Sequence, residues 1–282
     1  MPLTVPESFA NGFDDEGAKW LARLPALAES MLERWHLTLD GEPMHGVCAL
    51  ALPVRRATSE QAVLKVTWPH EEAAHEALAL RLWAGAGAVR LLADDPADWA
   101  ILLERLDPTT SLLDVPLGEA VAVAGELIRA LDRPAPPNIG TVAATAARWV
   151  REFPEQNDGL VPAELVAQAV AYCRELGPRS ANRLVNQDLH YENVLRGSRA
   201  PWLLIDPKPI AGDPEFGLFQ LLSNRFDEST PDGRLADVVA AAELDLSLAR
   251  RWTFVRAIDV WLDCDEDDWL GDTSARIATA LA

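Results

Sequence analysis

The 282-residue sequence contains no long hydrophobic run. It has no stretch of about 18 uncharged apolar residues, the length that a membrane-spanning helix needs. The N-terminal segment also lacks the basic region followed by an apolar region that marks a secretory signal peptide. We therefore expect a cytoplasmic protein that does not interact with membranes.

Positive charge is scarce, because 25 lysine and arginine residues face 44 acidic residues and leave a formal net charge of −19. Such a protein repels the phosphates of nucleic acids and anionic lipids, so we expect neither as a partner. The charge suits a polycationic small substrate, but it is equally explained by solubility alone. Cysteine is also rare, and Cys48, Cys173 and Cys264 lack the spacing of metal ligands, which indicates reduced thiols.

The residues that are abundant indicate a folded protein, because 49% are hydrophobic and no low-complexity tract occurs. A helix with an internal proline, Pro25, is predicted over residues 14–35. A second helix is predicted from residue 70 to 83, after Pro69. Five runs in this part of the chain resemble strands, namely 36–40, 46–54, 61–68, 89–94 and 99–106.

After residue 107 the pattern becomes mostly helical, with helices expected near 139–153 and 161–176 and again after residue 214. We expect an α+β fold of two lobes. Residues 1–106 would form an antiparallel sheet with a helix, and residues 107–282 a mostly helical lobe.

The segment 184–214 places polar residues at the ends of short apolar runs. Asp188 is followed after four residues by Asn193, and a second apolar run ends at Asp206. This spacing is typical of a phosphoryl-transfer catalytic loop. In that chemistry a carboxylate orients the attacking hydroxyl, while an amide oxygen and a second carboxylate hold Mg²⁺ against the nucleotide phosphates.

The stretches NQDLHYENVL and WLLIDPKPIAGDPEF resemble the aminoglycoside phosphotransferases, in particular their streptomycin 6-kinase and hydroxyurea phosphotransferase branch. The resemblance implies a protein-kinase-like fold with ATP and Mg²⁺ as cofactors. It implies that Asp188 is the catalytic base and that Asn193 and Asp206 are the metal ligands. The N-terminal lobe would bind the nucleotide, and the C-terminal lobe would hold the catalytic and substrate-binding groups.

Lys65 lies within the apolar run VLKV, where a lysine is either paired or at an exposed edge. The family pattern places such a lysine on the α- and β-phosphates and pairs it with a glutamate of the next helix. We assign Glu76 to this role, with Glu72, one helical turn away, as the alternative. By the same resemblance, Glu104 and Leu106 belong to the segment whose backbone groups bind the adenine.

The sequence departs from the family pattern at several positions. Residues 40–46 are expected to join the first two strands, where a kinase-like fold has its phosphate-covering loop. They contain only two glycines, and without the resemblance an ordinary hairpin turn explains them better. Gln187 replaces the glycine that usually precedes the catalytic aspartate, and Gly217 stands where many relatives carry an acid. The resemblance assigns Asp213 to anchoring the catalytic loop, and we expect Lys208 to contact either phosphate or Asp213.

The leading hypothesis is an ATP- and Mg²⁺-dependent O-phosphotransferase that acts on a hydroxyl of a small polar cation, of the streptomycin kinase type that gives antibiotic resistance. We expect a monomer or a homodimer. Acidic groups near the C-terminus would bind the ammonium or guanidinium groups of the substrate; they are Asp263, Asp265 and Glu266. An acidic helix end exposed to solvent would give the same pattern.

Three alternatives remain at this point. The first is a kinase of hydroxyurea or of another small metabolite. The second is a nucleotide-binding regulator without turnover, which the presence of Lys65, Asp188, Asn193 and Asp206 disfavours. The third is a metal-dependent hydrolase, which would use Asp188, His190, Asp206 and Asp213 but leaves the strand lysine and its glutamate unexplained.

Overall fold

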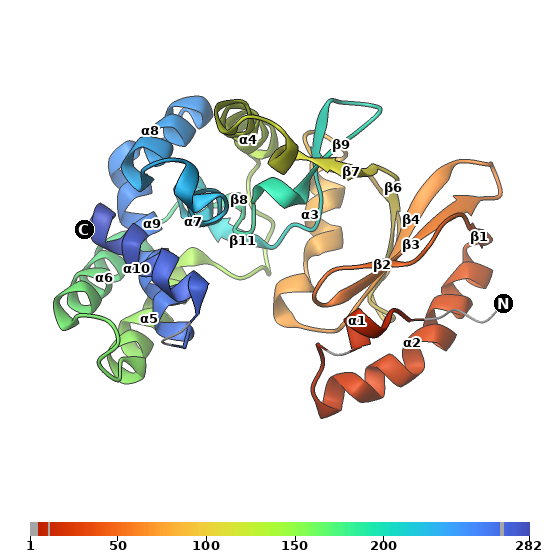
Figure 1. The fold of residues 1–282 in the computed structure, drawn as a ribbon, viewed down its shortest axis with the longest axis horizontal. Helices are drawn as coiled ribbons and strands as arrows, with labels where there is room; N and C mark the ends of the chain where they lie inside the picture. The colour runs from red at the N-terminus through yellow and green to blue at the C-terminus, as the bar shows by residue number, and fades with distance from the viewer. Residues whose placement is uncertain (1–4, 11, 266–267) are drawn as a thin grey trace. The chain divides into compact units, whose positions relative to one another are not determined.

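The computed structural model describes residues 5–10, 12–265 and 268–282, and Figure 1 shows its helices and strands. The chain divides into two compact units, Met1–Asp107 and Pro108–Ala282. Each unit buries its own apolar residues, so each is described separately.

The first unit is built on an antiparallel sheet in the order β1-β3-β4-β6-β5, with β2 also paired to β3. Its strands are β1 (Leu37–Leu39), β2 (Met44–His45), β3 (Ala49–Arg56), β4 (Gln61–Thr67), β5 (Leu91–Asp95) and β6 (Ala100–Glu104). Its helices are α1 (Glu7–Ala10), α2 (Asp15–Arg34), the 3₁₀ turn η1 (Glu71–Ala73) and α3 (Glu76–Trp83).

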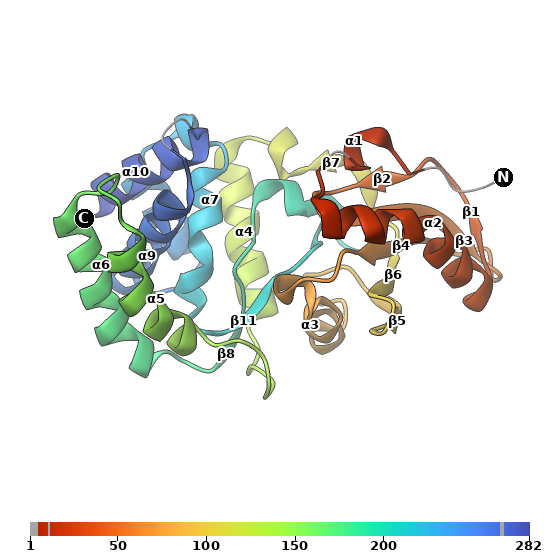
Figure 2. The same ribbon diagram turned by 90° about the horizontal axis from the view of Figure 1, so that it is seen from below.

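Helix α2 covers one face of this sheet. The Asp14 carboxylate caps the helix by accepting hydrogen bonds from the amides of Glu16 and Gly17. Pro25 lies inside the helix without ending it. The apolar side of α2 packs against alternate residues of the central strands, in a core that includes Leu24, Met31, Leu50, Leu64 and Leu102. Figure 2 shows α2 and α3 on opposite faces of the sheet.

The first strand of the sheet is broken, which differs from the prediction. The sequence suggested a turn at 40–46 between the first two strands, but Met44 and His45 pair with β3, and the hairpin turn follows at 46–48. The break is held by Asp40, whose carboxylate accepts hydrogen bonds from Gln61, Arg55 and Arg105. These bonds hold the pKa of Asp40 below its usual value, with the Gln61 bond as the largest cause.

The second unit is mostly helical and carries two small sheets. Its helices are η2 (Leu112–Asp114), α4 (Leu117–Leu131), α5 (Val142–Gln156), α6 (Ala163–Leu176), η3 (Gly177–Arg179), η4 (Tyr191–Asn193), η5 (Pro214–Leu218), α7 (Phe219–Ser223), η6 (Phe226–Glu228), α8 (Pro231–Ala242), α9 (Leu246–Asp263) and α10 (Trp269–Leu281). Its strands are β7 (Asp107–Ser111), β8 (Arg183–Asn186), β9 (Val194–Arg196), β10 (Trp202–Leu204) and β11 (Pro209–Gly212).

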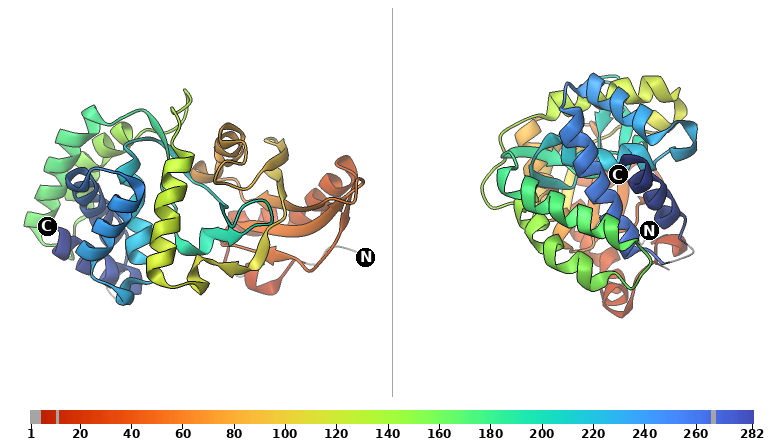
Figure 3. Two further views of the ribbon diagram at one scale, coloured as in Figure 1. Left: turned by 90° about the horizontal axis from the view of Figure 1, so that it is seen from above. Right: turned by 90° about the vertical axis from the view of Figure 1, so that its left-hand side faces the viewer.

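The small sheets position the segment that the sequence singled out. Strands β9 and β10 form an antiparallel hairpin that β7 extends, and β8 pairs antiparallel with β11. Helices α4 and α8 lie side by side, and α9 packs among α5, α6, α8 and α10 (Figure 3). The sequence predicted the hairpin strands and most helices but missed β7, β8, β11 and α10.

No helix in the described ranges has the length and apolar character needed to cross a membrane. The cysteines Cys48, Cys173 and Cys264 are free thiols. Burial raises the pKa of Cys173 to about 12, so this thiol stays protonated at neutral pH.

Candidate active site

In the first unit, Lys65 and Glu76 form a buried ion pair. Lys65 Nζ donates to Glu76 Oε1 at 2.9 Å and to Oε2 at 2.8 Å, and the two residues are 8% and 4% exposed. Strand β4 directs its even-numbered apolar residues toward α2, so Lys65 points to the opposite face, where α3 begins with Glu76. The pairing that the sequence left open between Glu72 and Glu76 therefore includes Glu76.

The predicted adenine-binding segment follows the end of β6. The Glu104 side chain accepts a hydrogen bond from the Arg90 amide, and its own amide donates to Arg90 O. Within the described part of the chain, the Leu106 amide makes no hydrogen bond. Leu106 thus offers a backbone donor that a ligand can use, whereas the side chain of Glu104 is already engaged.

In the second unit, the β9–β10 hairpin brings Asn193 and Asp206 together. Val194 pairs with Leu204, and the Ile205 amide donates to Asn193 O at 2.8 Å. Asp206 follows directly with φ of +49°, a left-handed conformation that is unfavourable for residues other than glycine. Such strained residues are common at functional sites.

Asp188 lies on the loop between β8 and η4, with its side chain 15% exposed. Burial raises the pKa of its carboxyl, and the nearby carboxylate of Asp206 acts in the same direction. Lys208 and His190 oppose this rise, and Lys208 Nζ lies 3.4 Å from Asp188 Oδ2. Asn193 Nδ2 reaches the Asp188 carbonyl oxygen at 3.4 Å.

Asn186, at the end of β8, connects two loops of the site. Its Oδ1 accepts hydrogen bonds from the Asp188 amide at 3.1 Å and from the Lys208 amide at 2.9 Å. The sequence analysis missed this residue. Its position two residues before Asp188 was the available signal, but an asparagine there does not by itself reveal a bond to residue 208.

Gly217 packs directly against the same strand end. A Cβ atom at this position would collide with the carbonyl oxygen of Asn186 and would lie 3.2 Å from Val185 Cγ1. There is therefore no space for an acidic side chain at position 217.

The expectation for Asp213 needs correction. Asp213 accepts hydrogen bonds from the Ala181 amide at 2.7 Å and from Trp252 Nε1 at 2.9 Å. It therefore ties the segment before β8 to α9 and does not bind the catalytic loop. Lys208 forms an ion pair with Asp188, where the sequence suggested Asp213 or a phosphate, and its contact with phosphate stays a prediction.

The donor set of Asn193 and Asp206 fits Mg²⁺ chemically, because it offers an amide oxygen and a carboxylate, both hard oxygen ligands. The β9–β10 hairpin places Asn193 and Asp206 close together along neighbouring strand ends, an arrangement that suits the binding of one ion by both residues. Among the described residues no group of three or more His, Cys, Asp or Glu side chains is arranged to hold a metal. Magnesium does not require such a cage, because water and substrate phosphates usually complete its coordination.

The predicted cation-binding residues lie at and after the C-terminal end of α9. Asp263 is the last residue of this helix, and Asp263 and Asp265 are both exposed. Glu266 lies outside the described residues. The described pair shows solvent-accessible carboxylates, and their role in binding stays a prediction.

Comparison with known proteins identifies the family. The model of the aminoglycoside/hydroxyurea antibiotic resistance kinases matches residues 34–266. A streptomycin 6-kinase of Streptomyces glaucescens is 36% identical over 100% of this chain and 96% of its own length. A hydroxyurea phosphotransferase of Kitasatospora aureofaciens is 38% identical over 94% of this chain and 81% of its own length.

Solved structures agree with the fold. A choline/ethanolamine kinase family protein from Mesorhizobium loti superposes with a TM-score of 0.64 at 18% identity, over 93% of this chain and 94% of the other. The aminoglycoside phosphotransferase APH(4)-Ia superposes with a TM-score of 0.63 at 15% identity, over 91% and 98%. The chain therefore belongs to the aminoglycoside/hydroxyurea antibiotic resistance kinase family and has a protein-kinase-like α+β fold.

Proposed function

We propose that the protein transfers the γ-phosphoryl group of ATP to a hydroxyl of a small polar cation of the streptomycin type, with Mg²⁺ as the second cofactor. The main support is that the stretch matched by the family model, residues 34–266, includes every residue to which we assign a role in catalysis or nucleotide binding. An enzyme with this activity would inactivate the antibiotic and so give resistance.

In this proposal Asp188 orients the acceptor hydroxyl and accepts its proton. Its environment supports the assignment, because burial raises its pKa while Lys208 keeps a positive charge 3.4 Å away. The carboxyl thus has an increased proton affinity with its ionised form still paired. Asn186 Oδ1 holds the Asp188 amide and so limits movement of the loop.

Each unit contains residues to which the family pattern assigns a role toward the nucleotide. Lys65, oriented by Glu76, would bind the nonreacting phosphates, and the backbone at Glu104 and Leu106 would bind the adenine. Asn193 and Asp206 would hold Mg²⁺, which when bound neutralises charge on the phosphates. Residues 1–106 and 107–282 would thus act as the nucleotide-binding lobe and the catalytic and substrate-binding lobe.

The identity of the acceptor rests on weaker support. Streptomycin 6-kinases match the whole chain, and the net charge of −19 suits a cation. The exposed carboxylates Asp263 and Asp265 are candidates for binding it. The second candidate function is a kinase of hydroxyurea, because the hydroxyurea phosphotransferase is as similar to this chain as the streptomycin kinases are.

The test is ADP release by the purified protein with Mg·ATP. The acceptors are streptomycin, a 2-deoxystreptamine aminoglycoside, hydroxyurea and a blank. We expect strong release with streptomycin only, and a loss of about 100-fold or more in Asp188→Asn, the size of a general-base contribution. Turnover with hydroxyurea alone would favour the second candidate, and release of phosphate without ATP dependence would favour a hydrolase.

A further inference from the structure

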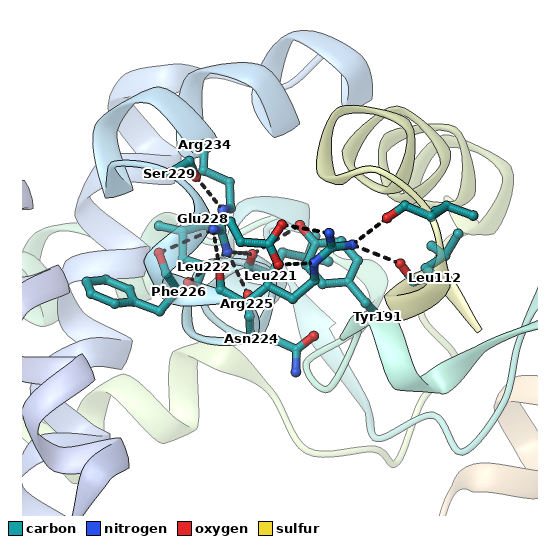
Figure 4. A network of polar contacts seen from close by, with 11 residues as sticks. Leu112, Tyr191, Leu221, Leu222, Asn224, Arg225, Phe226, Glu228, Ser229 and Arg234 are labelled. Atoms are coloured by element: carbon teal, nitrogen blue, oxygen red, sulfur yellow. Dashed lines mark hydrogen bonds and ion pairs between the residues drawn. The ribbon is translucent and has the colours of Figure 1, made fainter. Parts of the chain in front are cut away.

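Arg225 connects three segments of the second unit (Figure 4). Its Nη1 donates to the carbonyl oxygens of Leu112 at 3.1 Å and Val115 at 2.8 Å, on the segment that leads into α4. Its Nε and Nη2 each donate at 2.7 Å to one oxygen of the Glu228 carboxylate. The side chain is 11% exposed, so nearly all of it is engaged with protein.

The third segment is the catalytic loop itself. The guanidinium carbon of Arg225 lies 5.7 Å from the centre of the Tyr191 ring, within the range of a cation–π contact. Tyr191 lies between Asp188 and Asn193, is fully buried, and donates from its hydroxyl to Leu221 O at 3.2 Å. The Tyr191 ring therefore connects the loop that carries the predicted base and metal ligand to Arg225 and to Leu221.

The backbone of Arg225 is itself held in place. Its φ of +58° is a left-handed conformation that costs a non-glycine residue free energy. The buried guanidinium of Arg234 compensates by binding main-chain carbonyl oxygens on both sides, including Leu222 at 3.2 Å and Phe226 at 3.3 Å, and that of Arg225 itself. Figure 4 shows these bonds converging on Arg234.

We propose that Arg225 is a positioning residue for the phosphoryl transfer: it fixes the catalytic loop, through the Tyr191 ring, against the segment 112–115 that precedes α4. The inference rests on the proposed function only for its effect on turnover, because the effect on the loop is a property of the protein alone. A lysine cannot replace this arginine, because one ammonium group lacks the planar fork that binds Glu228 with two bonds while facing the ring.

The test uses the full-length protein with Arg225→Lys, Arg225→Gln and Glu228→Gln. Arg276→Lys is the matched control, because Arg276 also stacks on an aromatic ring, that of Phe226 at 4.4 Å, and pairs with Asp227 and Asp272. None of these contacts involves the catalytic loop. Amide hydrogen exchange of residues 188–196 is compared with that of α6, and kcat is compared with the KM for ATP.

We expect about 10-fold faster exchange in residues 188–196 of Arg225→Lys, with α6 unchanged, because the loop loses its support. We expect kcat with streptomycin to fall by about 10-fold or more, while the KM for ATP stays within about 2-fold, since misplacement affects the reacting groups most. Glu228→Gln should change both quantities in the same direction but less, and Arg276→Lys should change neither.

The proposal is overturned if loop exchange in Arg225→Lys equals that of the wild type, or if exchange rises equally in α6, which indicates general destabilisation. Should Arg225→Gln fail to fold, the lysine variant and Glu228→Gln still decide the question. A wild-type protein without acceptor-dependent turnover would contradict the proposed function, while the exchange comparison would still decide the role of Arg225.

Discussion

At the level of single residues, charges differ strongly in how far they are shielded from water. Lys65 and Glu76 form an ion pair with side-chain exposures of 10% and 5%, whereas Arg81 and Asp94 pair with exposures of 55% and 21%. Removing one partner of a buried pair leaves an uncompensated charge, whereas an exposed partner is solvated by water. We therefore expect mutation of the buried pair to reduce the free energy of unfolding more than mutation of the exposed pair.

Lys65→Met is expected to reduce the free energy of unfolding by about 3–5 kcal/mol, because it strands the Glu76 carboxylate. The double variant Lys65→Met/Glu76→Leu should recover much of this loss without recovering activity. Arg81→Met is the control and should cost less than about 1 kcal/mol. Urea unfolding measures all three, and equal losses in Lys65→Met and Arg81→Met would contradict the prediction.

Asp259 on α9 gives a prediction for pH. Burial raises its pKa from 3.8 to about 6, and Asp263 and Glu152 act in the same direction, while Arg256 and Arg148 oppose them. The folded state thus binds this proton more tightly than the unfolded state does. The group favours folding below pH 3.8, and this contribution is lost as the pH rises through about 6.

We therefore expect Asp259→Asn to become progressively more stable than the wild type between about pH 4 and pH 7. The difference amounts to at most about 3 kcal/mol from the size of the pKa change. Urea unfolding at several pH values measures it. Asp227→Asn, at a side chain that is 86% exposed, is the control. A stability difference that does not depend on pH would argue against a raised pKa.

At the level of secondary-structure elements, close packing is clearest between α4 and α8. A Cβ atom on Gly125 of α4 would lie 2.6 Å from the carbonyl carbon of Ala241 in α8, whereas one on Gly118 of the same helix meets nothing within 4 Å. Gly125 therefore allows α4 to pack closely against α8, whereas Gly118 does not contribute to this packing.

Gly125→Ala should destabilise the protein, because overpacking costs about 1–3 kcal/mol and exceeds the gain of up to about 1 kcal/mol in helix propensity. Gly118→Ala should stabilise it by about 0.5–1 kcal/mol. Thermal unfolding of the two variants measures the difference. A stabilising Gly125→Ala would show that α4 and α8 are less closely packed than described.

The elements also show what the sequence could predict. Apolar periodicity located α2, β4 and the β9–β10 hairpin, because their patterns are local. Strand β2, Met44–His45, was missed because it has only two residues and its pairing with β3 is not visible in the local pattern. Strand β7 was missed because its residues, DPTTS, are polar and its pairing with β9 is not visible locally.

The candidate site likewise contains residues that the sequence pattern reveals and residues that it does not. Asp188, Asn193 and Asp206 could be proposed from the sequence because phosphoryl transfer requires fixed residue types at a fixed spacing, and their roles stay predictions. Asn186 and Arg225 were not, because each acts through backbone groups of other segments, and such contacts leave no pattern in the sequence. The pairing of Lys208 with Asp188 likewise depended on the positions of two loops.

At the level of the whole molecule, the net charge of −19 affects how a substrate approaches. A cationic acceptor is attracted by this charge, and dissolved salt screens the attraction. We expect the KM for streptomycin to rise several-fold between about 0.05 and 0.5 M NaCl, with little change for uncharged hydroxyurea if it is accepted. A KM for streptomycin that does not respond to salt would indicate that charge plays no part in recognition.

The most direct test of the proposed reaction is mass spectrometry of streptomycin after incubation with the protein and Mg·ATP. The wild type should add one phosphoryl group to the antibiotic, and folded Asp188→Asn should do so about 100-fold more slowly or less, because the acceptor hydroxyl loses its base. Unmodified streptomycin from a wild-type protein that binds ATP, or equal modification by Asp188→Asn, would contradict the proposed reaction.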